Sequence, residues 1–383
     1  MTRRKLPWVL PMVAAVLLFA VPSVAAGHTS DSVNPELTHS TQGAVFTMTN
    51  SASGNVVLAY VIGPGGSLIP AGHFGTHGKG TGVSLADQGA LALSANHQWL
   101  LVVDAGSNAV SIFRVNSLSG SGPLLTFVDK VNSHGTLPVS VAIHGSFVYV
   151  LNAGTSTVPG NIFGFFLADH GLLFPLPGSS RALSTSASTA PAEILFNPAG
   201  TVLVVSEKNT SVLDTYTVGH RGYASGPSVT ASSGATPYGF AFGRSGTLVV
   251  SDAGPGALSS YAVARSGALT VKSGSITDGG TAPCWVATVD GGRIAYTSNA
   301  HSSTISTYKI NPSGTLTLLA PVAATTGAAD TDLAVGGSHG KYLFVYDAGA
   351  GEIEAYAIGS GASLTLQYAV FSLPATTEGL AAF

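Results

Sequence analysis

The sequence is short of cysteine and of charge, and each shortage excludes a class of protein. Cys284 is the one cysteine among 383 residues, so no disulfide can form within the chain. Only 9% of the residues are charged, with 15 basic and 18 acidic side chains, which argues against nucleic acid or an anionic membrane surface as a partner. A fold of this composition must be stabilised by apolar burial and by backbone hydrogen bonds.

The first 26 residues have the pattern of a secretory signal peptide. Arg3, Arg4 and Lys5 precede the apolar run "VLPMVAAVLLFAV", and small residues follow up to Ala26. The run is short for a membrane span, so we expect cleavage, no membrane insertion afterwards, and a secreted, extracellular or periplasmic protein. An uncleaved N-terminal anchor is the alternative. Cleavage leaves 12 basic and 18 acidic side chains, a net charge of −6, and residues 27–41 then form a flexible leader.

Glycine and one repeated pattern are what the sequence has in abundance. The 48 glycines and 45% hydrophobic residues are typical of many short strands joined by tight turns. Five segments contain an acidic or amide residue, eight intervening residues and an aromatic residue: Asp104 to Phe113, Glu207 to Tyr216, Asp252 to Tyr261, Asn299 to Tyr308 and Asp347 to Tyr356. An apolar run precedes each segment. Two looser copies occupy 45–60 and 148–166, the second with an insertion around 159–161.

Ahead of each apolar run the sequence predicts one more short strand. The starts of these strands align at Gln88, Pro138, Pro191, Pro237, Pro283, Asp330 and Thr377, with spacings of 46 to 53 residues. Proline at the first position of a strand removes no ladder hydrogen bond. Four strands in a period of this length are the signature of a β-propeller blade.

The two ends of the chain complete the pattern. The last copy, "TEGLAAF" (377–383), is an innermost strand alone, whereas the first copy, near Gly43, lacks that strand. Joining them would pair two open sheet edges. We therefore predict an all-β, seven-bladed β-propeller over 42–383, with blade 1 closed by the C-terminal strand. Two separate β-sandwiches would leave the constant spacing unexplained, and 75–82 and 179–190 are predicted to be surface loops.

Three stretches resemble those of a known family. They are "FNPAGTVLVVSEKNTSVLDTY", "DGGRIAYTSNAHSSTISTYKINPSGTL" and "VYVLNAGTS". These stretches resemble the seven-bladed lactonase propellers, the family of bacterial 6-phosphogluconolactonase and muconate-cycloisomerase-like proteins with YVTN-type repeats. The resemblance implies a site at one mouth of the central channel, built from an Arg-His pair, a Glu and an Arg. Aligned without gaps, these positions fall on Ala192 and Glu193, on Lys208 and on Ala300, so all four have changed.

The changed positions argue against a phosphorylated substrate. A dianionic phosphate needs Arg or Lys donors, but Lys208 is the single basic residue predicted near this mouth, among many acidic ones. We therefore expect a monomeric, secreted lactone hydrolase (a carboxylic-ester hydrolase) for an unphosphorylated lactone or sugar-like molecule. The alternative is a non-catalytic propeller that binds a ligand, a glycan or a protein at its channel mouth.

Two carboxylates are the candidate catalytic residues. Glu207 ends a strand where other blades have Asp or Asn, which make better turn bonds, and Glu193 starts an innermost strand that borders the channel. A base with a raised pKa in an acidic mouth would open the lactone ring. The candidate ligand-binding residues are Trp285, Asp332, Asn299 and His301.

Calcium is the one cofactor that the side chains suggest, and no motif requires it. Asn152 and Asp252 end strands equivalent to that of Glu207, and carboxylates and amides are ligands of hard cations. A bound Ca²⁺ would polarise a lactone carbonyl and activate water. The structural alternative is that these side chains hold backbone N–H groups of their own turns. His73 and His77 lie in a Gly-rich stretch rather than on a helix and predict no zinc site.

Overall fold

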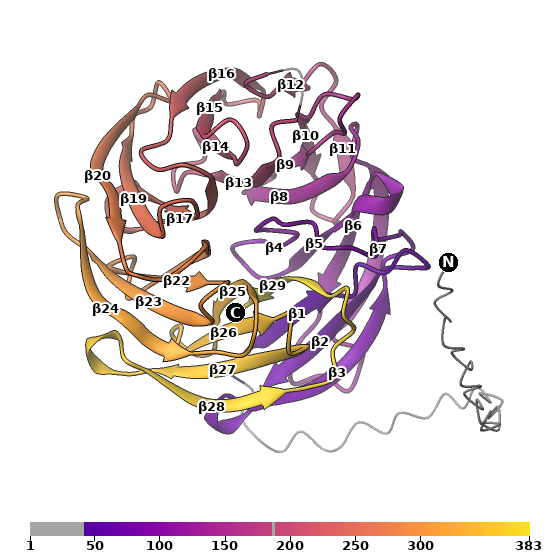
Figure 1. Cartoon of the computed structure of the whole chain (residues 1–383). Coiled ribbons are helices and arrows are strands. Elements are labelled where there is room, and N and C mark those ends of the chain that lie inside the picture. Colours follow the sequence, from indigo (N-terminus) through magenta and orange to yellow (C-terminus); the bar gives the residue numbers. More distant parts are fainter. Residues whose placement is uncertain (1–41, 186–187) are drawn as a thin grey trace, which may run out of the picture. The chain divides into compact units, whose positions relative to one another are not determined.

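The computed structural model describes residues 42–185 and 188–383 of the chain. The predicted signal peptide (1–26) and leader (27–41) lie outside the described residues. The described strands form seven antiparallel sheets around a common axis (Figure 1). The predicted all-β, seven-bladed propeller is therefore confirmed, and we number its sheets as blades 1 to 7 in chain order.

The first three blades contain the strands up to Ala182. Blade 1 consists of β29 (Glu378–Ala382), β1 (Ala44–Met48), β2 (Val56–Ile62) and β3 (Leu68–Gly75). Blade 2 consists of β4 (Leu91–Leu93), β5 (Trp99–Asp104), β6 (Ala109–Val115) and β7 (Leu125–Asn132). Blade 3 consists of β8 (Pro138–His144), β9 (Phe147–Asn152) and β10 (Asn161–Leu167), with β11 (Leu173–Pro175) and β12 (Arg181–Ala182) both pairing with β10.

The other four blades each have four strands in simple succession. Blade 4 consists of β13 (Pro191–Phe196), β14 (Val202–Glu207), β15 (Val212–Val218) and β16 (Ala224–Ala231). Blade 5 consists of β17 (Pro237–Phe242), β18 (Thr247–Asp252), β19 (Ala257–Val263) and β20 (Leu269–Thr277). Blade 6 consists of β21 (Pro283–Val289), β22 (Ile294–Asn299), β23 (Thr304–Ile310) and β24 (Leu316–Thr325). Blade 7 consists of β25 (Asp330–Gly336), β26 (Tyr342–Asp347), β27 (Glu352–Ile358) and β28 (Leu364–Val370).

The helices of the described residues are single turns. They are η1 (Pro64–Gly66), η2 (Ala105–Ser107), η3 (Arg244–Gly246) and η4 (Ser360–Ala362). Within 42–185 and 188–383, no helix has the length and apolar character that crossing a bilayer would require.

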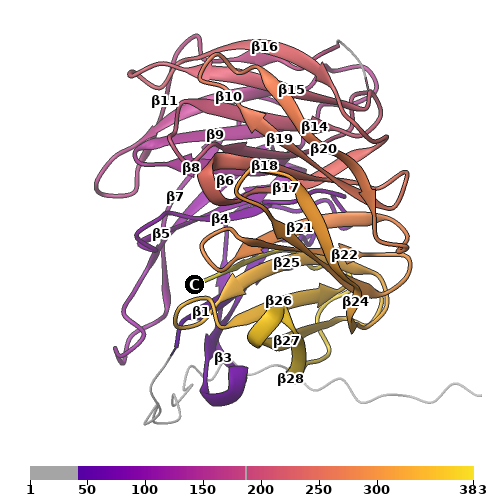
Figure 2. The same cartoon turned by 90° about the vertical axis from the view of Figure 1, so that its left-hand side faces the viewer.

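The C-terminal strand closes blade 1, as the sequence predicts. β1 pairs with β2 on one side and with β29 on the other, with Val45 opposite Ala382 and Phe46 opposite Ala381. Figures 1 and 2 both place the C-terminus beside β1. The first and last parts of the chain thus share one sheet, and neither leaves an open edge there.

Burial explains why the second strand of each blade is an unbroken apolar run. β14 and β18 are buried at every position, because neighbouring blades cover both faces of the sheet. The outermost strand β16 is exposed at most positions. Strong hydrophobicity therefore marks the middle of each blade, and polar alternation marks its rim.

In blades 4, 6 and 7 the repeated aromatic residue is a tyrosine that connects its blade to the preceding one. Its ring is almost fully buried between blades, and the hydroxyl finds a backbone partner there, as buried tyrosines usually do. The hydroxyl groups donate from Tyr216 to Ala182 O (2.8 Å), from Tyr308 to Ile276 O (2.8 Å) and from Tyr356 to Thr325 O (3.0 Å). The spacing seen in the sequence is thus a contact between blades.

Five innermost strands begin where the sequence predicts, and blade 2 differs. The five are β8, β13, β17, β21 and β25, which start at Pro138, Pro191, Pro237, Pro283 and Asp330. In blade 2, β4 starts at Leu91 rather than Gln88, because Gln88 bonds to Val286 in blade 6 instead of pairing with β5. The segment 179–190 also differs from prediction, since it contains β12, which pairs with β10.

Candidate functional site

The innermost strands present backbone N–H groups to the axis. Each such strand ends its sheet, so the N–H groups on its free edge need acceptors from elsewhere. Side chains of the preceding blade supply them. Glu193 Oε2 accepts from the Phe240 N–H (2.6 Å), and Asp332 Oδ2 accepts from the Leu380 N–H (2.7 Å). Both acceptors follow a β-bulge at the start of the strand, which turns their side chains toward the next blade.

Residues 84–90, here called the strap, cross the axis at the end where the innermost strands begin. Figure 1 shows the segment before β4 reaching into the middle of the ring. The Leu85 N–H donates to Glu378 Oε1 in blade 1 (2.9 Å). The Gln88 N–H donates to Ala192 O in blade 4 (3.0 Å). The strap therefore ties blades that are far apart around the ring.

Two side chains of the ring donate to carbonyl oxygens of the strap. Lys208 Nζ donates to Ala86 O, and Trp285 Nε1 donates to Asp87 O (2.7 Å). The Lys208 ammonium also lies 4.5 Å from the centre of the Tyr238 ring, a cation–π contact. These donors come from blades 4 and 6, so they meet at the axis only in the closed ring.

The strap fits because one position in the ring is glycine. Gln88 Nε2 donates to Val286 O (2.9 Å), and Gln88 Oε1 accepts from the Val286 N–H (3.1 Å). Gly239 occupies the place that Glu193 and Asp332 hold in their blades, and a Cβ atom there would lie 2.0 Å from Gln88 Oε1. The missing side chain of blade 5 is thus replaced by the amide of Gln88.

Five ionisable side chains, one of them from the strap itself, lie near one another at this end of the axis, and we call them the axial cluster. They are Asp87, Glu193, Lys208, Asp332 and Glu378. Asp87 is 3% exposed, and neither of its carboxylate oxygens has a hydrogen-bond partner among the described residues. Burial raises the pKa of Asp87 well above its usual value, the neighbouring Glu378 and Asp332 raise it further, and Lys208 opposes them.

Burial also shifts the pKa of each other member of the axial cluster toward its uncharged form. Burial raises the pKa of Glu193 and of Asp332, although backbone N–H donors to each carboxylate oppose the shift. Burial raises the pKa of Glu378 to about 7. The pKa of Lys208 is lowered by burial. Within this cluster, Glu378 is therefore able to accept or donate a proton near neutral pH.

Glu207 does not join the axial cluster. Its carboxylate accepts from the Ser184 N–H (2.9 Å) and from the hydroxyls of Ser184 and Thr210. It also faces Asp214 on β15, and burial together with Glu207 raises the pKa of Asp214 to about 8. Glu207 and Asp214 thus form a carboxyl pair away from the axis, and the pair retains a proton at neutral pH.

The residues equivalent to Glu207 are also engaged within the blades, and we call this set the outer anchors. They are Asp104, Asn152, Glu207, Asp252, Asn299 and Asp347. Asp252 accepts from the hydroxyls of Ser259, Ser275 (3.1 Å) and Ser232 (3.3 Å). Hydroxyl groups and the loop before the blade are their main partners, rather than the backbone N–H groups of their own turns.

The remaining sequence candidates lie in separate blades. Asn152 Nδ2 donates to Ser133 O (3.2 Å), and Asn299 Nδ2 donates to Ser306 Oγ (2.8 Å). His301 is exposed in the turn after β22. The structure thus brings Glu193, Trp285 and Asp332 together at the axis, and it places the other candidates elsewhere.

One acidic group has the spacing of metal ligands. Within the described residues, Asp347, Glu352 and Glu354 in blade 7 are buried and offer oxygens within 4.8 Å of one another. Glu354 accepts from the Tyr356 hydroxyl (2.6 Å). Asn152 and Asp252, the residues predicted to bind calcium, are not part of this group.

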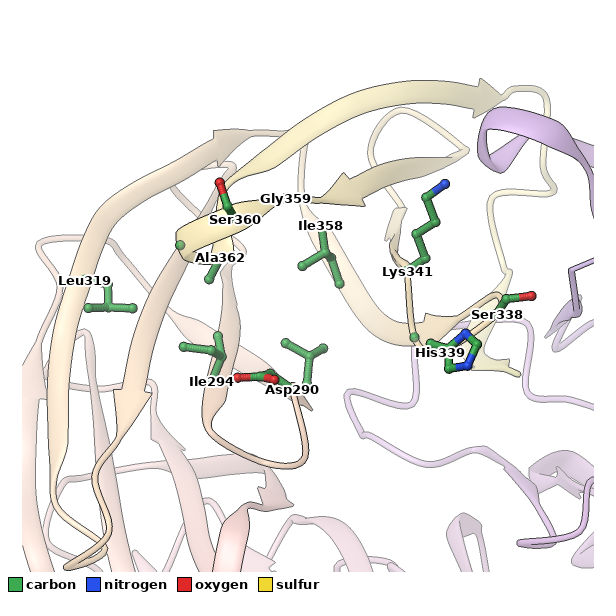
Figure 3. Close-up of a pocket in the computed structure, with 13 residues that line it drawn as sticks. Asp290, Ile294, Leu319, Ser338, His339, Lys341, Ile358, Gly359, Ser360 and Ala362 are labelled. Carbon is green, nitrogen blue, oxygen red and sulfur yellow. The ribbon is translucent and has the colours of Figure 1, made fainter.

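A hollow of about 700 Å³ lies at the other end of the blades, between blades 6 and 7. Figure 3 shows the side chains of Ile294, Ile358 and Ala362 around it. Similar hollows of about 460 and 570 Å³ lie between blades 2 and 3 and between blades 4 and 5. Because these hollows recur with unrelated linings, we attribute them to the packing of hairpins and place the candidate site at the axial cluster.

Sequence reasoning missed the strap. The sequence predicts an innermost strand that starts at Gln88, although two signals set this segment apart. Blade 2 lacks the proline that opens four of the other innermost strands, and Gly239 interrupts a row of larger residues at the axis. Neither signal says which blade the Gln88 side chain would reach.

Comparisons with known proteins agree with this architecture. Residues 250–378 match the family model described as Lactonase, 7-bladed beta-propeller. Comparison with curated protein sequences gives no match. The resemblance inferred from the repeats is confirmed by this match and by the seven blades.

Solved structures share the fold at low sequence identity. The periplasmic gluconolactonase of Pseudomonas aeruginosa is 16% identical, with 89% of this chain and 98% of that chain covered at a TM-score of 0.71. A candidate 6-phosphogluconolactonase of Bacteroides fragilis is 17% identical, with 91% and 100% covered at 0.70. Virginiamycin B lyase of Staphylococcus aureus is 14% identical, with 77% and 88% covered at 0.54. The chain is therefore a seven-bladed β-propeller that resembles the lactonase family, whose model its residues 250–378 match.

Proposed function

We infer that this protein is a lactonase for an unphosphorylated lactone, with its site at the axial cluster. The observation that carries this proposal is the meeting of four carboxyl groups and one ammonium group at the end of the axis. A buried mixture of proton acceptors and a single cation suits hydrolysis of an uncharged ester. A relative with the same fold is named a gluconolactonase, which supports the substrate class.

Glu193 and Lys208 are the residues to which we assign the chemistry. Glu193, in its ionised form, takes a proton from water as the water oxygen attacks the lactone carbonyl carbon. The Lys208 ammonium stabilises the oxyanion that forms on the carbonyl oxygen. The ring C–O bond then breaks, and the ring oxygen leaves as a hydroxyl with the proton held by Glu193.

The charge of the axial cluster sets the expected selectivity. A 6-phosphosugar lactone would bring a dianion toward Asp87, Glu193, Asp332 and Glu378, with Lys208 as the one opposing charge. Like charges in a poorly solvated site repel strongly. We therefore expect glucono-δ-lactone to be hydrolysed and its 6-phosphate to be a poor substrate.

A hydrolysis assay with matched variants tests the proposal. Acid release from both lactones is followed in a pH-stat, with subtraction of the spontaneous rate. Glu193→Gln should reduce kcat at least about 100-fold, the usual contribution of a general base. Glu207→Gln is the comparison variant, because it changes a buried carboxylate outside the cluster. Absence of turnover by the wild-type protein, or loss of turnover in Glu207→Gln alone, would overturn the assignment.

A non-catalytic binding role is the second candidate. It is favoured by Ala192 and Ala300, which occupy positions where the resemblance implies an Arg and another Arg. Ala192 is a fully buried alanine, so this position supplies no cation to the channel mouth. Saturable binding of glucono-δ-lactone in calorimetry, without acid release, would support this role instead.

A further inference from the structure

The strap occupies the donors that a bound ester would need. Lys208 Nζ and Trp285 Nε1 both donate to the strap, the first to Ala86 O and the second to Asp87 O. These two acceptors are carbonyl oxygens of successive residues. A lactone also presents two neighbouring oxygens, the carbonyl oxygen and the ring oxygen, and only these accept hydrogen bonds at its reactive end.

The closed strap carries two unfavourable features. Asp87 is buried against Glu193, Asp332 and Glu378, and its carboxylate oxygens lack hydrogen-bond partners among the described residues. A buried polar group without a partner costs free energy that hydration would recover. Ala86 also has a φ of 52°, a left-handed conformation that is costly for a residue with a Cβ atom. Release of the strap would relieve both.

The strap is held by exchangeable hydrogen bonds and by a few apolar contacts, since Ala90, Leu85 and Ala86 pack against the cores of the blades. Gln88 forms two bonds with the Val286 backbone, and Leu85 N–H donates to Glu378 Oε1. Each has an equivalent partner in water, so the net contribution of each bond is small. The second strands of the blades, in contrast, are fully buried.

We propose that the strap is a displaceable internal ligand, and that an uncharged lactone or ester replaces its Ala86 and Asp87 carbonyl oxygens on Lys208 and Trp285. Displacement opens the axial cluster and brings the substrate carbonyl to the Lys208 ammonium. The selection of a lactone rests on the proposed function, whereas the movement of the strap does not.

Hydrogen exchange with mass spectrometry tests this proposal on the full chain in its folded form. The probe is glucono-δ-lactam, an amide analogue that resists hydrolysis and presents the same carbonyl oxygen. We expect saturating lactam to increase exchange of amides in 84–90 at least tenfold while exchange in β14 stays unchanged. Unchanged or slower exchange of 84–90 in a protein that demonstrably binds the lactam would overturn the proposal.

Two variants loosen the strap without changing the donors. Gly239→Ala places a Cβ atom against Gln88 Oε1, and Gln88→Ala removes both bonds to Val286. Either variant should increase exchange of 84–90 without any lactam. Gly54→Ala is the matched control for Gly239→Ala, because a Cβ atom there meets nothing within 4 Å. If Gly239→Ala does not fold, Gln88→Ala is tested alone. Exchange of 84–90 in Gln88→Ala that is as slow as in the wild type would contradict the proposal.

The results separate this proposal from the proposed function. Strap opening by the lactam without any lactone turnover would refute the lactonase and leave the displaceable strap in place. Turnover that depends on Glu193, combined with a strap that stays protected, would refute the displacement alone. Trp285→Phe removes the indole N–H that donates to Asp87 O, so it should increase exchange of 84–90 without any lactam, as Gln88→Ala does.

Discussion

Two sets of buried carboxylates arise from the same repeat and have different surroundings. An outer anchor such as Asp104 accepts from Thr76 Oγ1 (2.6 Å), Ser111 Oγ (2.6 Å) and Asn55 Nδ2 (3.0 Å). In the axial cluster, Asp87 has no such partner among the described residues and faces other carboxylates instead. Equal burial thus goes with different hydrogen bonding. We therefore assign a structural role to an outer anchor such as Asp104 and propose a reactive role for the axial cluster.

The largest expected effect is on stability, at an outer anchor. Asp104→Leu leaves the three donors of Asn55, Thr76 and Ser111 without their acceptor, so we expect unfolding free energy to fall by about 3 kcal/mol. Asp104→Asn keeps one acceptor oxygen and should cost less. Urea unfolding followed by tryptophan fluorescence measures both, and a Leu variant as stable as wild type would remove the distinction between the two sets.

The matching change in the axial cluster should act in the opposite direction. Asp87→Asn removes a carboxyl group that burial and like charges disfavour, so we expect a gain of about 1 kcal/mol at pH 8. Because the folded-state pKa is raised, wild-type stability falls as pH rises above the unfolded value of about 4. The gain should therefore be small at pH 5, and a variant that is less stable than wild type at pH 8 would contradict this.

The carboxyl pair of blade 4 gives a smaller and pH-dependent effect. Burial, followed by Glu207, raises the pKa of Asp214 to about 8, so the folded state holds a proton that the unfolded state releases above about pH 4. Wild-type stability from this group thus declines between about pH 4 and pH 8. Asp214→Asn cannot ionise. The Tm difference between this variant and the wild type should therefore be about 2 °C larger, in favour of the variant, at pH 8 than at pH 5. Parallel pH–Tm curves for both proteins would exclude a shared proton.

The smallest effect is expected at the hollow between blades 6 and 7. The ion pair of Arg293 and Asp290 (3.0 Å) has side chains that are 58% and 59% exposed. Exposed pairs of this kind contribute little, so Arg293→Ala should change unfolding free energy by less than about 0.5 kcal/mol. A larger loss of unfolding free energy, measured by urea unfolding, would show that the side chains at this end of the ring contribute more to stability than hairpin packing explains.

The ring was predictable from the sequence because its determinants are local. An apolar second strand and an aromatic residue at fixed spacing recur along the chain. Proline opens four of the innermost strands, and Pro191 and Pro237 mark strand starts to the residue. The closure by β29 followed from a missing strand at one end and an extra one at the other.

The site was only partly predictable because it depends on contacts across the ring. Glu193, Trp285 and Asp332 were identified because they share one position in the repeat. Nothing in the spacing reveals that Gln88 reaches Val286, about half a ring away, or that Asp87 lies among the other carboxylates. Glu207 was selected for its unusual side chain, and the structure surrounds it with Ser184, Thr210 and Asp214.

The most direct test measures kcat for glucono-δ-lactone in Glu193→Gln and Asp104→Asn side by side, at a temperature where both variants are folded. The account predicts that the axial variant loses at least about 100-fold in kcat, whereas the outer-anchor variant retains the wild-type value. Wild-type kcat in Glu193→Gln, or a comparable loss in folded Asp104→Asn, would contradict the assignment of the reactive site to the axis.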